Sequence, residues 1–287
     1  MTIHDNAHPL PAPDTKEELR HALLDIESWE AGQKDLWFWE KLGRLPFQLL
    51  DRLTPKALQN KLAQAIDEVG SFVQTGGRYL ISEQSVLDEL NRQLAGRQSK
   101  PDAPAFADAL TLGEVASLPL TVMDGAADEF ARSRTLFATA QGATTGFGGL
   151  FTLAIDIPAI LGLSLKVLQE MAMVYGYDPN DKRERVFVIK CLQFASSDIV
   201  GKKAVLEELA DFDNEHRQRD AISQLQGWRE VVTIYRDNFG WKKLFQLVPV
   251  AGMIFGAVLN RSTLQDVAEA GKMLYRKRRV LERLHSS

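Results

Sequence analysis

Residues 142–176, GATTGFGGLFTLAIDIPAILGLSLKVLQEMAMVYG, decide how this chain can fold. The run is long and nearly uncharged, and its glycines gather at its start. Apolar residues recur every three or four positions, as on the buried stripe of a helix. They are Ile157, Ile160, Leu161, Leu165, Leu168, Met171 and Val174. Since almost every other face is apolar too, we expect a helix that is covered by the rest of the protein or by lipid.

The composition limits the classes of protein that fit. The chain has 287 residues, 45% hydrophobic and 25% charged, as in an ordinary globular protein. Its net charge of −4 argues against a surface built for nucleic acid. The N-terminus lacks the features of a signal peptide. With Cys191 as the one cysteine, no internal disulfide can form, so we expect a cytoplasmic protein with this residue buried on a helix.

The order of local signals predicts an all-α fold. Residues 1–14 are predicted to be a disordered lead-in, and residues 15–96 are predicted to form an N-terminal helical region. In that region Thr15 and Glu18 form a capping box before a helix over 16–43. Further helix starts are indicated at Thr54 with Pro55, at Ser82 or Ser85, and at Asp181. Residues 97–106 read as a linker, and 107–287 as a helical core.

Two aromatic or apolar stretches lie outside the central run. Trp37, Phe38 and Trp39 fit either a membrane-interface anchor or, preferably, core packing at a helix end. Residues 244–259, LFQLVPVAGMIFGAVL, form a second apolar segment interrupted by Pro249. Asn260, which follows it, reads first as a helix-boundary residue. The sequence thus predicts a multi-helix bundle with two glycine-rich apolar helical hairpins packed centrally.

The glycine spacing in the two segments favours close helix packing. Each carries Gly-x-x-x-Gly, at Gly142 and Gly146 and at Gly252 and Gly256. This motif lets helices approach in lipid or in a protein core. Length disfavours a membrane span, because about 20 apolar residues are needed. An aspartate near the middle of a span costs about 3 kcal/mol. A surface-lying or re-entrant hairpin and a buried core hairpin both stay open.

Asp156 is the one acid early in the central run. It precedes Ile157 and Pro158, so the favoured interpretation is an N-cap of a helix running to Tyr175. The alternative is a buried catalytic or proton-relay carboxyl group with a raised pKa.

Positive charge is densest at Arg276, Lys277, Arg278 and Arg279, near the end of the last predicted helix. Such cations favour anionic lipid headgroups. They also complement the negative end of a helix dipole, which is a purely local reason for their presence.

Motifs of catalysis are missing from the sequence. There is no His-x-x-x-His, no His-Glu-x-x-His and no Gly-x-Ser-x-Gly. Gly146, Gly148 and Gly149 lack the preceding strand and the Gly-Lys-Ser/Thr of a phosphate loop. We therefore expect no cofactor, no metal site and no catalytic residues.

Two ordered motifs resemble the EcsC protein family. The first includes the glycine cluster, Asp156 with Pro158, and the turn at Tyr175, Gly176 and Asp178; the second includes Pro249, Gly252, Gly256 and Asn260. The resemblance covers about residues 50–284 and leaves the helix over 16–43 outside. It implies a bacterial protein related to one encoded beside an ABC transporter, EcsAB, in a family whose biochemical role is described as unknown.

Two hypotheses follow. The first is a non-enzymatic accessory protein docked peripherally on the inner face of the cytoplasmic membrane or on a membrane complex such as a transporter. Its hairpins would supply apolar area and its C-terminal cations would attract anionic headgroups. The second is a helical enzyme or carrier with an apolar pocket around Asp156. The shortage of catalytic motifs favours the first.

Overall fold

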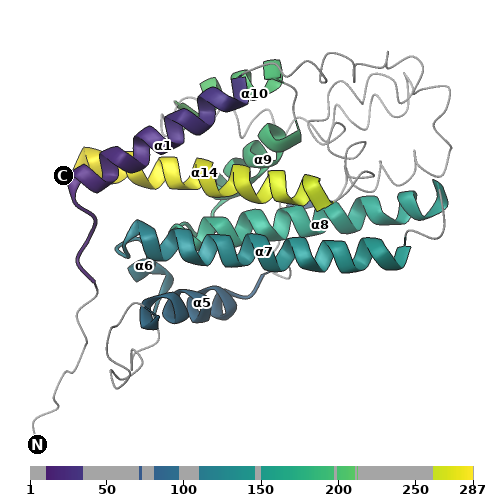
Figure 1. Cartoon of the computed structure of the whole chain (residues 1–287), viewed down its shortest axis with the longest axis horizontal. Helices are drawn as coiled ribbons and strands as arrows, with labels where there is room; N and C mark the ends of the chain where they lie inside the picture. The colour runs from purple at the N-terminus through teal and green to yellow at the C-terminus, as the bar shows by residue number, and fades with distance from the viewer. Residues whose placement is uncertain are drawn as a thin grey trace, which may run out of the picture.

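The described part of the chain is all-α. A computed structural model describes the backbone of residues 11–34, 71–72, 81–96, 110–145, 150–196, 199–210, 212 and 261–286, and their side chains except those of 34, 137–160, 196–201 and 261–263. Eight helices are defined in these residues, which contain no strand (Figure 1). They are α1 (Lys16–Lys34), α5 (Glu83–Ala95), α6 (Leu112–Val115), α7 (Leu120–Thr145), α8 (Leu150–Val174), α9 (Lys182–Ser196), α10 (Ile199–Ala210) and α14 (Arg261–Ser286). The predicted all-α class is confirmed.

Local capping signals set several helix starts. The Thr15 backbone N–H donates to Glu18 Oε2 at 2.7 Å, so the capping box before α1 is confirmed. Ser82 is the N-cap of α5, where its side chain accepts from the Ser85 backbone N–H. Asp181 Oδ1 accepts from the Arg183 N–H at 2.9 Å at the start of α9, as predicted.

The start of α8 corrects the prediction for Asp156. This helix begins at Leu150, so Asp156 lies in its second turn and does not cap it. Pro158 lies further inside the helix, where it removes one backbone hydrogen bond. The capping interpretation was wrong because it took the Asp-x-Pro signal as a boundary, whereas the helix continues through it.

Helix α14 is the centre of the bundle and packs against α1, α7, α8 and α9. Leu264, Val267, Leu274 and Tyr275 are among its buried side chains. Gly271 permits the close approach of α8: a Cβ atom at this position would lie 2.6 Å from Leu168 Cδ2. Burial of apolar area around α14 is therefore the main stabilising contribution to the fold.

The helix directions place four helix ends at one end of the bundle. Along α7, Asp124 and Asp128 pair with Arg276 and Lys272, so α7 runs antiparallel to α14. Asp124 of α7 bonds Tyr175, just after α8, whereas Arg134 further along α7 pairs with Glu170, so α8 runs antiparallel to α7. Figure 1 shows the consequence: the C-terminal ends of α1 and α7 and the N-terminal ends of α8 and α14 point the same way. We call this the apolar end, for the sequences attached to it, and the opposite end the ion-paired end.

Several predictions fall outside the described residues. They concern the extension of the first helix over 35–43, the helix starting at Thr54, the linker over 97–106, the glycines at 146, 148 and 149, the segment 244–259 and Asn260. Gly142 belongs to the last turn of α7, and α14 begins at Arg261, directly after Asn260.

Candidate functional site

One face of α14 carries a row of four cations, Lys272, Arg276, Arg279 and Arg283. Their spacing of four, three and four residues places them on the same side of a helix. Lys272 and Arg276 pair with acids of α7, and Arg279 contacts the turn after α8. This face of α14 forms most of the ion-paired end.

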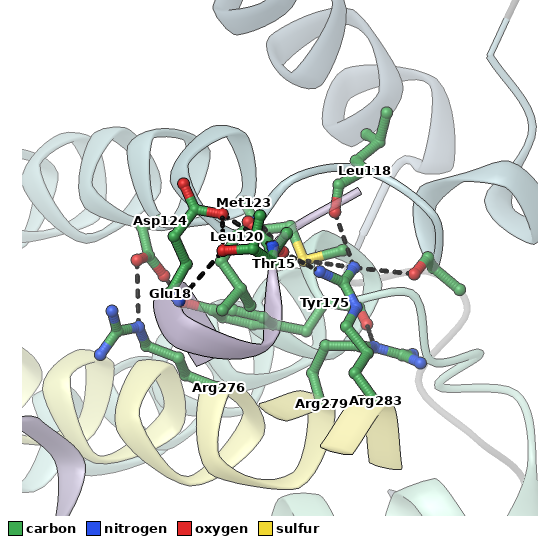
Figure 2. A network of polar contacts seen from close by, with 12 residues as sticks. Thr15, Glu18, Leu118, Leu120, Met123, Asp124, Tyr175, Arg276, Arg279 and Arg283 are labelled. Atoms are coloured by element: carbon green, nitrogen blue, oxygen red, sulfur yellow. Dashed lines mark hydrogen bonds and ion pairs between the residues drawn. The ribbon is translucent and has the colours of Figure 1, made fainter. Parts of the chain in front are cut away.

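Arg276 joins three helices through one carboxylate. Its Nε donates to Asp124 Oδ2 at 3.0 Å, and the Tyr175 hydroxyl donates to Asp124 Oδ1 at 2.7 Å (Figure 2). Tyr175 is fully buried, and burial raises the pKa of its hydroxyl well above the ordinary value. The phenol therefore stays protonated and acts as a hydrogen-bond donor.

Gly176 ends α8 in a left-handed turn, with φ of 80°. The Tyr177 N–H bonds the Ala172 carbonyl at 2.9 Å and the Gly176 N–H bonds the Met173 carbonyl at 2.9 Å, the pattern of a Schellman cap. A Cβ atom at Gly176 would lie 2.8 Å from the Ala116 backbone. Positive φ and this contact both require glycine.

Arg279 completes that turn from α14. Its Nε donates to the Tyr175 carbonyl at 2.9 Å and a terminal nitrogen donates to the Gly176 carbonyl at 3.3 Å. These carbonyls are at the negative end of the α8 dipole, so a guanidinium is favourable there. The turn at Tyr175 and Gly176 therefore serves as the joint between α8 and α14.

Arg283 and Asp14 close the ion-paired end. Arg283 forms a short ion pair with Asp14 and donates to the Ala116 and Leu118 carbonyls at 2.8 and 2.6 Å (Figure 2). Both Asp14 oxygens accept from the Leu120 N–H, at 3.0 and 3.1 Å. Asp14 thus caps α7, whose first turn has no acidic residue of its own.

On another side of α14, Arg278 occupies an aromatic box. Its guanidinium carbon lies 4.2 Å from the Tyr177 ring centroid and 5.1 Å from that of Phe187, and one terminal nitrogen donates to Glu184 at 2.8 Å. Desolvation raises the pKa of the Glu184 carboxyl despite the opposing effect of Arg278. This is a buried ion pair inside the core.

The four cations that the sequence associated with lipid headgroups all have partners within the protein. Arg276 pairs with Asp124, Lys277 with Glu30, Arg278 with Glu184, and Arg279 with backbone carbonyls and Glu282. Their side chains are at most 26% exposed. The C-terminal basic run is therefore turned toward the protein and is not displayed as a basic patch.

The apolar end differs sharply in charge. The last ion pair between α7 and α8 in this direction is bidentate: Arg134 Nε and one terminal nitrogen donate to Glu170 at 3.0 and 2.6 Å. Beyond it, residues 135–165 contain a single charged residue, Asp156. Leu136, on α7 just past the pair, is 57% exposed.

The other apolar stretches attach at the same end. The chain leaves α1 at Lys34 shortly before Trp37, Phe38 and Trp39, and it enters α14 at Arg261 directly after the segment 244–259. The end of α1 lies near the start of α14, since Trp29 Nε1 donates to Glu269 at 2.7 Å. Three apolar or aromatic sequences thus connect to one end of the bundle.

The described residues that could act as nucleophiles or metal ligands have structural roles. Cys191 is buried, as predicted, and burial raises the pKa of its thiol well above the ordinary value. No group of three or more His, Cys, Asp or Glu residues in the described part of the chain could hold a metal ion. A hollow beside Arg278 measures about 60 Å³, far below a ligand pocket of roughly 300 Å³ or more. A wider, open hollow at the ion-paired end, lined by Asp14 and Arg283 among others, measures about 530 Å³.

None of the described helices combines the length and the hydropathy that crossing a bilayer requires. Of residues 137–160, positions 137–145 belong to α7 and positions 150–160 to α8.

The described chain is therefore an all-α bundle around a cationic central helix, with one ion-paired end and one apolar end. It belongs to the EcsC protein family, whose profile matches residues 20–280. This match starts well before residue 50, so α1, which the sequence analysis left outside the resemblance, is part of the family region.

Two relatives in Bacillus subtilis (strain 168) are similar to this chain. "Uncharacterized protein YdbA" is 55% identical over 271 residues, which cover 94% of this chain and 96% of the relative. "Protein EcsC" is 31% identical over 145 residues, 50% of this chain and 58% of the relative. No solved structure matches the chain.

Sequence reasoning missed the acids that hold α14. The sequence patterns did not identify any of the residues in these contacts, which are Asp14, Asp124, Asp128, Glu184 and Arg283. The spacing of the α14 cations could have indicated a paired helix face, and Asp124 with Asp128 lie four residues apart on α7. Their pairing itself has no signal in the sequence.

Proposed function

We propose that this protein is a non-enzymatic accessory protein that docks peripherally on the inner face of the cytoplasmic membrane with the apolar end of its bundle. The observation that carries the proposal is the convergence of apolar sequence at one end, where α1, α7, α8 and α14 all begin or finish. A membrane-surface protein buries apolar side chains at the boundary between headgroups and acyl chains. The run over 135–165, in which Asp156 is the single charged residue, supplies such side chains.

The pairing of the α14 cations changes the mode of binding that we expect. Arg276, Arg278 and Arg279 are occupied within the protein, so their attraction to anionic lipid is largely lost. Screening by salt acts mainly on exposed charge. Binding should therefore persist at high salt and depend chiefly on apolar contact.

Vesicle co-flotation of the full chain tests this proposal. We expect flotation with phosphatidylcholine vesicles that survives 1 M salt. Two exposed leucines give a matched pair of variants: Leu136 on α7 is 57% exposed and Leu24 on α1 is 60% exposed. Leu136→Glu should reduce flotation about tenfold, because it places a charge beside the inserted surface. Leu24→Glu should leave flotation unchanged.

The single buried cysteine permits a second readout. Cys191 is not exposed to reagents, so a cysteine introduced as Leu136→Cys can be labelled selectively with a polarity-sensitive dye. Its emission should shift to shorter wavelength when vesicles are added, and the same label at Leu24→Cys should not respond. Absence of flotation under every condition would reject the proposal and point to a protein complex as the partner.

A further inference from the structure

The open hollow at the ion-paired end has the volume of a small-molecule site. Its volume of about 530 Å³ falls within the range of roughly 300–1,000 Å³ that is usual for ligand pockets. Apolar walls and a few polar groups make up its lining, which includes Pro11, Pro13, Leu19, Asp14, Ser117 and Arg283. Such a lining is typical of a site that holds the apolar body of a ligand and orients one polar group.

Arg283 is held in position at this hollow by groups other than Asp14. One of its terminal nitrogens donates to the Ala116 carbonyl at 2.8 Å and to the Leu118 carbonyl at 2.6 Å (Figure 2). These two bonds orient the guanidinium whether or not Asp14 lies beside it. A cation that is already oriented loses little conformational entropy when an anion binds to it.

The surroundings of Arg283 favour an anion at one defined position. The side chain is 15% exposed, and burial lowers the pKa of its guanidinium, a shift that Asp14 opposes. A desolvated guanidinium is stabilised by charge-assisted hydrogen bonds to a carboxylate. The carboxylate of Asp14 fills this position and also accepts from the Leu120 N–H.

This carboxylate belongs to a segment with one polar anchor. Residues 11–13 make no hydrogen bond or ion pair with the described part of the chain. Asp14 alone in residues 11–14 makes such contacts, to Arg283 and to the Leu120 N–H. Displacement of one carboxylate would therefore free the whole segment 11–14.

Helix α1 does not need Asp14 for its own start. The Thr15 N–H donates to Glu18 at 2.7 Å, and the Glu18 N–H donates to the Thr15 hydroxyl at 3.3 Å. This capping box closes the helix directly after Asp14. Ala22 and Ile26 are buried and keep α1 packed. The segment 11–14 can thus leave the hollow while α1 stays in place.

We propose that the hollow binds a small carboxylate with an apolar body, and that Asp14 is a built-in competitor for this ligand. The ligand carboxylate replaces that of Asp14 at Arg283 and at the Leu120 N–H, and its apolar body fills the hollow beside Leu19. Segment 11–14 is released when the ligand binds. The proposal is independent of membrane docking, because the hollow lies at the end of the bundle opposite to the apolar end.

Calorimetric titration with benzoate, a rigid carboxylate with an apolar ring, tests the competition. Asp14→Ala should bind benzoate at least about tenfold more tightly than the unaltered protein, because a site that is open in about ten per cent of molecules or fewer loses that factor in affinity. Asp14→Asn keeps an acceptor for the Leu120 N–H without the charge and should lie between the two. Benzamide, the uncharged analogue, should not bind measurably. Sodium chloride keeps the ionic strength constant.

Two further variants serve as matched controls. Asp14→Ala with Arg283→Gln lacks both charges of the pair, and it should bind benzoate at least about tenfold more weakly than Asp14→Ala alone, because a charged hydrogen bond is lost. Glu17→Ala removes one negative charge from an exposed position in the first turn of α1, and it should bind benzoate as the unaltered protein does. Thermal unfolding checks that each variant is folded.

A spin label on the segment reports its release. Ala12 is exposed and Cys191 is buried, so Ala12→Cys can be labelled selectively. Saturating benzoate should increase the mobility of the label, and so should Asp14→Ala without any ligand. An unchanged label at saturation would contradict the release of the segment.

Three results of the titration would overturn the proposal. Absence of benzoate binding to a folded Asp14→Ala variant would show that the hollow is not a carboxylate site. Equal or weaker binding to Asp14→Ala than to the unaltered protein would show that Asp14 does not compete. Binding that is insensitive to Arg283→Gln would remove Arg283 as the receptor.

Discussion

The two ends of this helical bundle differ in what holds them together. At the ion-paired end, cations of α14 bind acids and backbone carbonyls of other segments. Arg276 pairs with Asp124 of α7, Arg279 donates to the Tyr175 carbonyl after α8, and Arg283 pairs with Asp14 of the N-terminal segment. At the apolar end, the sequence between Arg134 and Lys166 offers one charge in 31 residues, 135–165. The first end has fixed its polar groups within the fold, and the second carries long stretches of apolar sequence.

This contrast shows why a basic run in a sequence is weak evidence for lipid binding. Arg278 and Arg279 belong to the densest positive charge of the chain, yet both are buried. Their hydrogen bonds end at Glu184 and at the Tyr175 carbonyl. A cation that already satisfies a buried acceptor would have to break that contact before it could bind a phosphate.

The largest effect is expected at Arg278. Arg278→Leu leaves the buried carboxylate of Glu184 without its partner, which should lower the free energy of unfolding at pH 7 by about 3 kcal/mol. The removal of charge from the exposed Arg132, in Arg132→Leu, should cost less than about 0.5 kcal/mol. Chemical denaturation measures both values.

The pH dependence of that loss provides a check. Desolvation raises the pKa of Glu184 in the folded protein, and the loss of Arg278 removes an interaction that lowers it. A carboxyl with a raised folded pKa costs stability as pH rises above the unfolded value. The deficit of Arg278→Leu should therefore shrink as pH falls toward 4.5, and Arg278→Leu with Glu184→Leu should recover most of it. A deficit that is constant with pH would contradict the role of Glu184.

A slightly smaller effect is expected at the joint between α8 and α14. Gly176→Ala forces a side chain into positive φ and against the Ala116 backbone, so it should destabilise the fold by about 2–3 kcal/mol. Gly162, inside α8 with open space around its Cα, is the control. Gly162→Ala should stabilise the protein by about 0.5–1 kcal/mol. Similar melting temperatures for the two variants would refute the account of the joint.

At the apolar end, the expected effect is on membrane partitioning and not on folding. Asp156 lies inside α8 and does not cap it, so Asp156→Asn should leave the melting temperature nearly unchanged. If the hairpin enters lipid, removing the charge should strengthen vesicle binding, by up to about 3 kcal/mol. Flotation at limiting lipid concentration measures the gain. A variant that unfolds earlier and floats no better would argue for a buried structural role.

The smallest effect belongs to the capping box at the start of α1. Hydrogen bonds from the Thr15 backbone and hydroxyl groups lower the pKa of the Glu18 carboxyl. A group with a lowered folded pKa stabilises the protein above its unfolded pKa, and this contribution disappears as pH falls through the folded value. Glu18→Gln should therefore be slightly less stable than the unaltered protein at pH 7 and equally stable near pH 2. An NMR titration of Glu18 gives its pKa directly.

Much of the local structure was readable from the sequence. The helix starts at Thr15, Ser82 and Asp181 follow from side chains that bond backbone N–H groups two or three residues away. The all-α class and the family membership follow from helical periodicity and from ordered motifs. The start of α8 was misread, because the signal at Asp156 and Pro158 is also compatible with a helix interior when the surrounding residues favour helix.

The tertiary structure alone decided which groups meet. Asp14 caps α7 at Leu120 across 106 positions of sequence, and Arg278 reaches Glu184 across 94. The sequence determined that the C-terminal helix is basic, whereas packing determined that its cations face inward and that three apolar stretches connect to one end. The physical reason is range: a cap is formed within one helical turn, but the partner of a long side chain depends on how every helix packs around α14.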